Sequence, residues 1–480
     1  MTKRMFLLVF LIAALLRTVS INQSLWLDEA INLNAVRASS FKNLIFDYSL
    51  GDFHPPLYHV LLKSWVTLFG SSEISARFPS VILALGTIFL TYRITKILFD
   101  KKTALISSIL LATAPLHIYY SQEARMYMLA AFLTTLSVYF FVSLIQRERL
   151  IFWIGFITST ALLLYTDYLP YLLLPTYGLF LLLNRKKFKS QLISFFPSVI
   201  IVFIILIPWL ILFPKQLHIG LSAKAASPAW AQVVGGGEFK NLLLTFVKFT
   251  IGRISYSQKT IYALLFAPLG LFVTALFAFS LFRISAKRSF VYFWLFLPII
   301  LAFITSYFIP VFSYFRFIFA LPAFYIIWAA AINSLNWTPL TRLLLTIALA
   351  LNLGTSFIYL TNPKFQREDW RSATAYVTGN SDAKTITLFE SEFSISPFDY
   401  YNTGKIPTAG VLTSFTADLN KFKPKLEASI REKNKVYLFQ YLSGITDSQG
   451  LVFQELTKDG FVNTQTKDFP GVGFVYEFKR

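Results

Sequence analysis

Residues 127–145 read YMLAAFLTTLSVYFFVSLI, a run of 19 residues without a single charge, bounded by Arg125 and Arg147. A helix of this length and apolar character is long enough to cross the hydrocarbon core of a bilayer. The stretch therefore predicts a membrane-spanning helix, and comparable runs on either side of it decide how often the chain crosses.

The whole composition agrees with a polytopic α-helical membrane protein. Hydrophobic residues make up 55% of the chain and charged residues only 14%, whereas a soluble domain carries about 25% charged residues. The first apolar run, 5–16, resembles a signal-peptide core, but no small-x-small cleavage site follows it, which favours a retained helix. Further candidate spans lie near 78–99, 103–119, 127–145, 150–166, 168–183, 192–213, 261–282, 289–309, 315–333 and 340–360. We therefore expect about 11 transmembrane helices.

The distribution of charge indicates an orientation. Residues 361–480 carry 15 Lys and Arg against 14 Asp and Glu, so nearly all of the net charge of +20 lies before residue 361. Those basic groups sit in short clusters between apolar runs, as the positive-inside rule predicts for cytoplasmic loops, and not on one soluble face as nucleic-acid binding would need. The pattern predicts an inside N-terminus in a plasma (inner) membrane, with residues 361–480 on the periplasmic or exterior side and no nucleic-acid partner.

Two extramembrane parts stand out. The first outer loop, about 22–77, contains the segments 29–46 and 57–69, whose apolar residues recur as in helices that lie in the membrane interface. The last 120 residues alternate short β-type runs (385–389, 435–441, 472–478) with polar stretches. We therefore expect a transmembrane domain at 1–360 and a small outer α/β domain at 361–480. The chain has no cysteine, which excludes disulfides and Cys-ligated zinc.

Adjacent carboxylates, Asp28 and Glu29, follow the first span where it meets the outer surface. Charged groups at a membrane boundary are costly and are by default a functional hypothesis. Such a carboxylate can act as general base on an acceptor hydroxyl or help to hold a divalent cation. The structural alternative is a solvated helix start, because acids favour helix N-termini.

Downstream in the same loop, His54 precedes two prolines, which prevent a helix there and fix the backbone direction. His54 is a candidate contact to a phosphate or a metal, and Tyr58 and His59 are further candidates for the same cavity. The alternative is a simple loop kink with a surface histidine.

A short connection between later spans combines an acid, a base and several tyrosines. Glu123 is a candidate to share a cation or substrate with Asp28, Arg125 to bind a phosphate, and Tyr127 to line the cavity. An internal Glu–Arg pair within an aromatic belt explains the same residues equally well. Three more candidates lie at other span ends: Asp167, Tyr314 and Arg316.

Taken together, these motifs resemble those of the GT-C superfamily of membrane glycosyltransferases, in the protein O-mannosyltransferase and lipid A aminoarabinose transferase group. The resemblance is carried by WLDEA (26–30), HPPLYH (54–59), SARFPS (75–80), YSQEARMYM (120–128) and, more loosely, SYFRFIFALPAF (313–324). It implies that Asp28 is the catalytic base, that His54 lies near the donor phosphate and that Glu123 is the second-loop acid. Because Glu123 stands alone instead of in an Asp-x-Asp, metal use stays open.

The resemblance further implies an inverting glycosyltransferase. A polyprenyl-phosphate sugar would be the donor and a hydroxyl of a lipid, glycan or protein the acceptor, with membrane lipids around the site. A polytopic transporter or flippase of lipid-linked sugars is the alternative; it would place charges near the bilayer midplane and show paired, interrupted helices.

Overall fold

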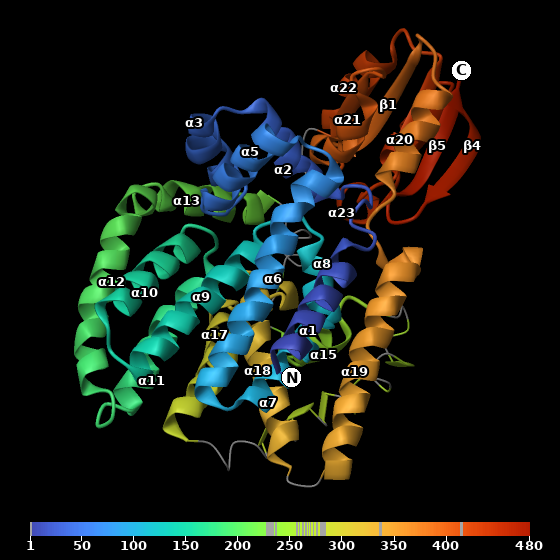
Figure 1. Ribbon diagram of the computed structural model, residues 1–480. Helices are drawn as coiled ribbons and strands as arrows, with labels where there is room; N and C mark the ends of the chain where they lie inside the picture. The colour runs from blue at the N-terminus through green and yellow to red at the C-terminus, as the bar shows by residue number, and fades with distance from the viewer. Residues whose placement is uncertain are drawn as a thin grey trace.

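The computed structural model describes residues 2–226, 235, 238–255, 285–335, 338–412 and 416–480, together with single residues and short pairs between 258 and 278. Figure 1 shows two parts: a large bundle of helices, and a smaller part with a sheet that stands at one end of the bundle. The core of the bundle is one continuous apolar cluster rich in aromatic rings, among them Trp294, Tyr325 and Trp328.

The helices of the bundle follow the apolar runs of the sequence. They are α1 (Thr2–Thr18), α6 (Glu73–Leu98), α7 (Lys101–Ala112), α8 (Pro115–Ser121), α9 (Tyr127–Gln146), α10 (Leu150–Leu164), α11 (Leu173–Leu183), α12 (Lys189–Leu210), α13 (Phe213–Ala226), α15 (Phe239–Ile251), α17 (Ala286–Thr305), α18 (Leu321–Ser334) and α19 (Thr338–Thr361). Two 3₁₀ turns, η2 (Leu169–Leu172) and η3 (Tyr314–Ala320), lead into α11 and α18.

Six of the described helices are long and apolar enough to cross a membrane: α6, α9, α12, α17, η3 with α18, and α19. A seventh results if α7 and α8, which meet at a bend of 59°, are one broken span. The expected spans in α1, α10 and α11 are helical but shorter, and the span expected at 261–282 lies largely outside the described residues. A protein with several membrane helices is confirmed, while the count of 11 stays a prediction.

The first loop is helical, as expected from its periodicity. It contains α2 (Leu27–Ala38), α3 (Phe41–Asn43), the π turn η1 (Leu44–Tyr48), α4 (Ser49–Gly51) and α5 (Leu57–Phe69). These elements cover one end of the bundle beside the sheet-containing part (Figure 1). Helix α5 begins directly after Pro55 and Pro56, because proline is compatible with a helix start but not with its interior. The two prolines thereby place His54 at the boundary between α4 and α5.

The C-terminal part is an α/β unit, as the sequence predicts. Its elements are α20 (Trp370–Gly379), β1 (Thr385–Ser391), α21 (Ser396–Asn402), β2 (Thr408–Leu412), α22 (Leu419–Ile430), β3 (Lys435–Phe439), α23 (Ser443–Thr446), α24 (Leu451–Lys458), β4 (Val462–Phe469) and β5 (Gly473–Lys479), with the short 3₁₀ turns η4 (Pro363–Phe365) and η5 (Glu392–Ser394). The strand order is β2-β1-β3-β5-β4, with β1 parallel to β2 and β3, and β5 antiparallel to β3 and β4.

The orientation of this sheet matters for the site. Helix α21 follows the carboxyl end of β1 and packs against α2, where the side-chain amide of Asn34 donates to the carbonyl of Ser396 (3.0 Å). In open α/β sheets the carboxyl ends of parallel strands are where ligands and functional side chains gather. The carboxyl end of β1 therefore faces the first loop and its acidic residues.

Candidate functional site

Glu29 is locked into a buried ion pair. Its carboxylate accepts two hydrogen bonds from Arg77 of α6, from Nε at 2.8 Å and Nη2 at 2.5 Å, and both side chains are at most 1% exposed. The backbone N–H of Ala124 donates to the same carboxylate (2.8 Å). Burial alone would raise the pKa of Glu29, but Arg77 outweighs it and the pKa lies below its usual value. Glu29 is therefore a fixed anion whose oxygens already have partners.

Asp28 differs sharply from its neighbour. Its side chain is 36% exposed, and its Oδ2 lies 4.0 Å from Nη2 of Arg125. Burial of the surrounding pocket raises the pKa of Asp28, and the charges of Asp52 and Glu29 add to the rise, while Arg125 and His54 oppose it. A carboxylate that is accessible and has a raised pKa is suited to accept a proton.

Asp52 organises the polar groups next to Asp28, and sequence reasoning did not select it. Its carboxylate lies 3.1 Å from Nη1 of Arg125, 3.0 Å from Nδ1 of His54 and 3.3 Å from Nε2 of His59. Although burial opposes ionisation, Arg125 and the two histidines hold the pKa of Asp52 well below its usual range. The sequence signal that could have identified Asp52 is its position two residues before His54, in DFHPP (52–56).

Glu123 belongs to a different ion pair from Asp28. Its Oε2 lies 2.8 Å from Nη1 of Arg367, which reaches in from the segment after α19, and both side chains are nearly inaccessible. Burial raises the pKa of Glu123, and Arg367 counteracts part of that rise. Arg367 also donates to the hydroxyl of Tyr119 (2.5 Å) and stacks on its ring, 3.8 Å from the centroid. Sequence reasoning missed Arg367, which lies in the polar run Gln366–Trp370 just beyond the last span.

These two ion pairs test whether Asp28 and Glu123 could share a cation, as the sequence allowed. Asp28 and Glu123 each face a different arginine, Arg125 and Arg367, so they do not present a common set of oxygens. Within the described part of the chain, no group of three or more His, Asp or Glu side chains is arranged to hold a metal ion. The structure thus brings Asp28, Asp52, His54, His59 and Arg125 together, and keeps Glu123 apart.

The remaining candidates from the sequence differ in how close they lie to this cluster. Tyr58 is buried beside His59, with ring centroids 5.9 Å apart. Tyr127 is buried against Phe315 of η3 (5.7 Å), and η3 also carries the partly exposed Tyr314 and Arg316. Asp167 lies in the turn after α10; among the described contacts, its carboxylate has no hydrogen bond or ion pair to the cluster.

Arg253, after α15, is a further cation that the sequence analysis did not select. It donates from Nη1 to the hydroxyl of Tyr119 (2.5 Å) while its side chain stays exposed. Among the ion pairs of the described residues, neither Arg253 nor Arg316 has a carboxylate partner. An exposed guanidinium without an anionic partner is available to an anionic ligand.

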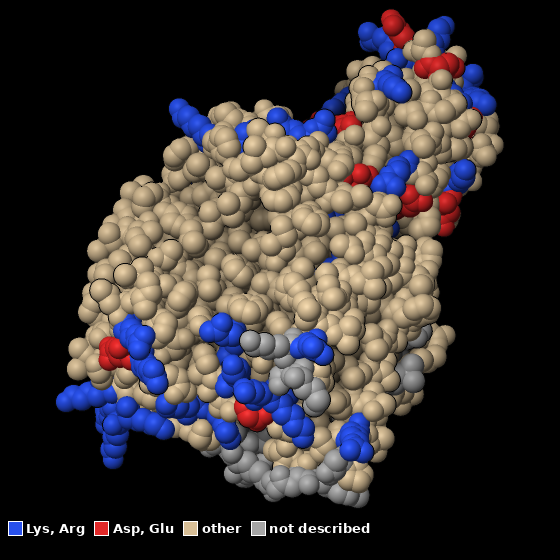
Figure 2. Space-filling view, in the orientation of Figure 1, with Lys and Arg blue, Asp and Glu red and all other residues tan. Residues whose placement is uncertain are grey.

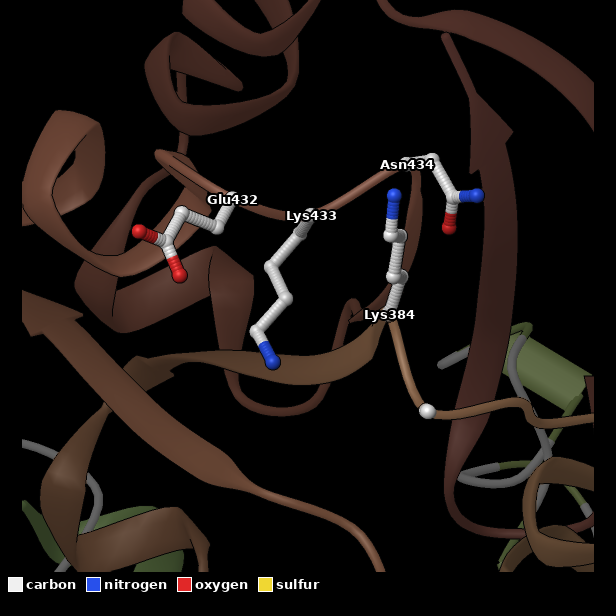
Figure 3. Close-up of a pocket in the computed structure, with 5 residues that line it drawn as sticks. Lys384, Glu432, Lys433 and Asn434 are labelled. Atoms are coloured by element: carbon white, nitrogen blue, oxygen red, sulfur yellow. The ribbon is translucent and has the colours of Figure 1, made fainter.

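A pocket in the C-terminal part does not join this site. It has a volume of about 560 Å³ and is lined by Ala383, Lys384, Glu432, Lys433 and Asn434, whose labelled side chains Figure 3 shows around the opening. These residues directly precede β1 and β3, so the pocket lies at the amino ends of the parallel strands, opposite the end that faces α2.

The contrast between the two neighbouring carboxylates predicts a contrast in stability. Glu29→Gln leaves the buried Arg77 without its counter-ion, which typically costs about 3–5 kcal/mol, so its melting temperature in detergent should fall clearly below wild type. Asp28→Asn removes a partly exposed charge with a raised pKa and should melt close to wild type. Equal melting temperatures for Glu29→Gln and wild type would contradict the buried pair.

Comparison with known proteins finds a family model that matches part of the chain. Residues 53–212 match the model of the family described as dolichyl-phosphate-mannose-protein mannosyltransferase. The matched stretch includes the cluster residues His54, His59 and Arg125 but begins after Asp28. An uncharacterised protein of Aquifex aeolicus (strain VF5) is 25% identical over 199 residues, which are 41% of this chain and 39% of that relative.

Solved structures share the fold over nearly the whole chain. The crystal structure of ArnT from Cupriavidus metallidurans bound to undecaprenyl phosphate is similar with a TM-score of 0.63 and 12% identity, over 98% of this chain and 97% of that one. The archaeal oligosaccharyltransferase AglB from Archaeoglobus fulgidus, in complex with an inhibitory peptide and a dolichol-phosphate, gives a TM-score of 0.53 and 13% identity, over 98% of this chain and 74% of that one. The family model thus matches one third of the chain, residues 53–212, and the solved structures share its fold. Both findings agree with the resemblance that the motifs carry.

Proposed function

We propose that the protein is an inverting glycosyltransferase that moves a sugar from a polyprenyl-phosphate donor to an acceptor hydroxyl. The observation that carries the proposal is the state of Asp28: of the three carboxylates Asp28, Glu29 and Asp52, it has the greatest exposure, 36% against 0% and 11%. The family match and the lipid phosphates bound to the two similar structures support a lipid-borne donor.

In this mechanism Asp28 is the general base. It accepts the proton of the acceptor hydroxyl while that oxygen attacks the anomeric carbon, and the bond from that carbon to the phosphate oxygen breaks. The raised pKa of Asp28 makes it a stronger base than an ordinary surface carboxylate. Glu29 cannot share this task because Arg77 and the N–H of Ala124 occupy its oxygens; we assign it to positioning, in place of the catalytic role expected from the sequence.

The leaving phosphate needs cations that are not already neutralised. Arg125 and His54 both contact Asp52, so much of their charge is compensated within the cluster. Arg316 and Arg253 have no such partner among the described ion pairs. Tyr314, the first residue of η3, has the ammonium of Lys248 5.8 Å from the centre of its ring. We therefore assign the donor phosphate chiefly to Arg316 and Arg253, with Tyr314 beside them, and leave His54 and Arg125 to orient Asp28 and Asp52.

The arrangement favours a transferase over a transporter or flippase of lipid-linked sugars. A transporter would place its charged groups near the bilayer midplane. Here Asp28 lies in α2 and Asp52 follows α4, in the first loop that covers one end of the bundle (Figure 1), and Arg125 lies just before the first residue of α9.

The base assignment predicts a selective loss of activity. Asp28→Asn should lower turnover by ~10²–10⁴, the usual cost of removing a general base, because the amide keeps the shape but does not accept the proton. Turnover of a labelled polyprenyl-phosphate sugar by purified protein is the measurement. Asp47→Asn, which changes an exposed carboxylate in the same loop, is the control and should keep wild-type activity. Activity of Asp28→Asn within threefold of wild type would refute the assignment.

The donor assignment predicts ligand-specific stabilisation. A polyprenyl-phosphate sugar should raise the melting temperature with a shift that grows with its concentration, because it binds only the folded protein, whereas UDP- and GDP-sugars should not. The shift should shrink in Arg316→Ala and Arg253→Ala. Arg342→Ala, which alters an exposed arginine near the start of α19, is the matched control. Stabilisation by nucleotide sugars alone would contradict a lipid donor.

The proposed orientation places this chemistry outside an inner (plasma) membrane. Figure 2 shows basic side chains gathered along the end of the bundle opposite the C-terminal part; the turn between α11 and α12, with Arg185, Lys186, Lys187 and Lys189, belongs to it. The positive-inside rule assigns this end to the cytoplasm.

Single cysteines test the orientation without background, because the chain has none. Ser448→Cys, in the C-terminal part, should react with a membrane-impermeant thiol reagent in intact cells or spheroplasts. Ser190→Cys, beside the basic turn, should react only after lysis; both positions are exposed. Labelling of position 190 from outside would reverse the topology.

A further inference from the structure

The C-terminal part is fastened to the short segment that leads into α2. The hydroxyl of Ser24 donates to the carbonyl of Glu368 (2.5 Å) and accepts the N–H of Trp370 (2.9 Å). The N–H of Leu25 donates to the hydroxyl of Tyr401 (2.8 Å). These bonds join residues about 340–380 positions apart in the chain, and all of them lie within four residues of Asp28.

Glu368 is the charged residue at the centre of this junction. Its carboxylate accepts the indole N–H of Trp370 (2.7 Å) and the hydroxyl of Tyr441 (2.9 Å), which follows the carboxyl end of β3. It also faces the backbone N–H of Leu27, the first residue of α2. An anion at that point is favoured by the dipole of α2, which leaves its first N–H groups without partners inside the helix.

Close packing holds Glu368 in this place. The adjacent backbone is tied down by the N–H of Asp369, which donates to the carbonyl of Pro470 (2.8 Å). Gly471 has φ +76°, and a Cβ on it would come within 2.9 Å of the Cα of Glu368, so the chain passes there only without a side chain. The hydrogen bonds from Trp370 and Tyr441 thus fix the carboxylate within the C-terminal part, and it meets the first loop at Leu27.

We propose that Glu368 is a positioning residue for Asp28: it holds the first turn of α2 in place from the C-terminal part, and its charge is energetically coupled to that of Asp28. This inference rests on the proposed function only in treating Asp28 as the base. The C-terminal part then contributes to the reaction, because the proton affinity of Asp28 depends on the position of that part relative to α2.

Electrostatics support the coupling. Burial raises the pKa of Glu368 to about 7; Trp370 and Tyr441 act against the rise, and the charge of Asp28 adds to it. Coupling between two sites is reciprocal, so an ionised Glu368 raises the proton affinity of Asp28 by the same free energy. The charged and titratable groups that face this pair are Tyr441 on the Glu368 side and, on the Asp28 side, Glu29, Asp52, His54 and Arg125.

The sign of the stability effect follows from linkage. A carboxyl group with a pKa of about 7 when folded and about 4.5 when unfolded binds more protons in the folded state, so it stabilises the fold at low pH and loses that contribution as pH rises from about 4.5 to 7. Glu368→Gln removes the titration but keeps an acceptor oxygen. The melting temperature of Glu368→Gln minus that of wild type should therefore rise with pH across this window and level off above it.

A double-variant cycle tests the coupling without any substrate. Melting temperatures are measured from pH 4.5 to 8 for wild type, Glu368→Gln, Asp28→Asn and the double variant. Glu432→Gln, which changes a carboxylate that lines the pocket in Figure 3, is the control. The pH-dependent gain from Glu368→Gln should be smaller in the Asp28→Asn background, because the charge of Asp28 supplies part of it. Glu432→Gln should give no pH-dependent gain. The same gain in both backgrounds, or no gain in either, would overturn the proposal.

Turnover gives the second readout and separates this proposal from the proposed function. Wild-type kcat with a polyprenyl-phosphate sugar should show a step near pH 7, where Glu368 ionises, and Glu368→Gln should lack that step. A merely structural role would lower the amplitude of the profile without removing the step. If wild type turns over no prenyl-phosphate sugar, the proposed function fails, and the melting cycle still decides whether Glu368 and Asp28 are coupled.

Discussion

The buried ion pair between Glu29 and Arg77 is the interaction on which the rest of the site depends. Two charges removed from water repay their desolvation only when the geometry is good and the remaining donors find acceptors. Here Arg77 also donates to the backbone carbonyls of Ile21, Gln23 and Ser24. One side chain of α6 thereby holds the segment between α1 and α2 and the first turn of α2 in a single arrangement.

This anchoring divides two adjacent carboxylates into two roles. The helix that presents Glu29 inward to Arg77 turns Asp28 toward Arg125 and the open side of the cluster. The environments then move their pKa values in opposite directions, downward for Glu29 and upward for Asp28. Separation of neighbouring acids by environment is a general way in which a fold assigns acid–base roles, and it explains why an Asp-Glu dipeptide need contribute only one base.

Most of the architecture was predictable from the sequence, because its signals are local. Apolar runs such as 127–145 predict helices, and the prolines at 55 and 56 mark where α5 begins. The motifs also led to Asp28, His54 and Arg125. What sequence reasoning missed are partners set by tertiary contacts: Asp52 beneath Arg125, Arg367 beside Glu123, and Glu368 at the start of α2. Arg367 lies more than 240 residues from Glu123, and Glu368 lies more than 340 residues from the start of α2, so no spacing rule connects them. Glu29 and Glu123, both candidates from the sequence, are buried in ion pairs with Arg77 and Arg367.

In the proposed mechanism, Asp28 faces a sugar whose lipid phosphate is held by Arg316 and Arg253. The most direct measurement is a structure of the wild-type protein in complex with a polyprenyl-phosphate sugar. We expect phosphate oxygens within hydrogen-bonding distance of at least one of these arginines, with the anomeric carbon of the sugar turned toward Asp28. A phosphate bound away from both arginines, or a sugar on the far side of the cluster from Asp28, would contradict it.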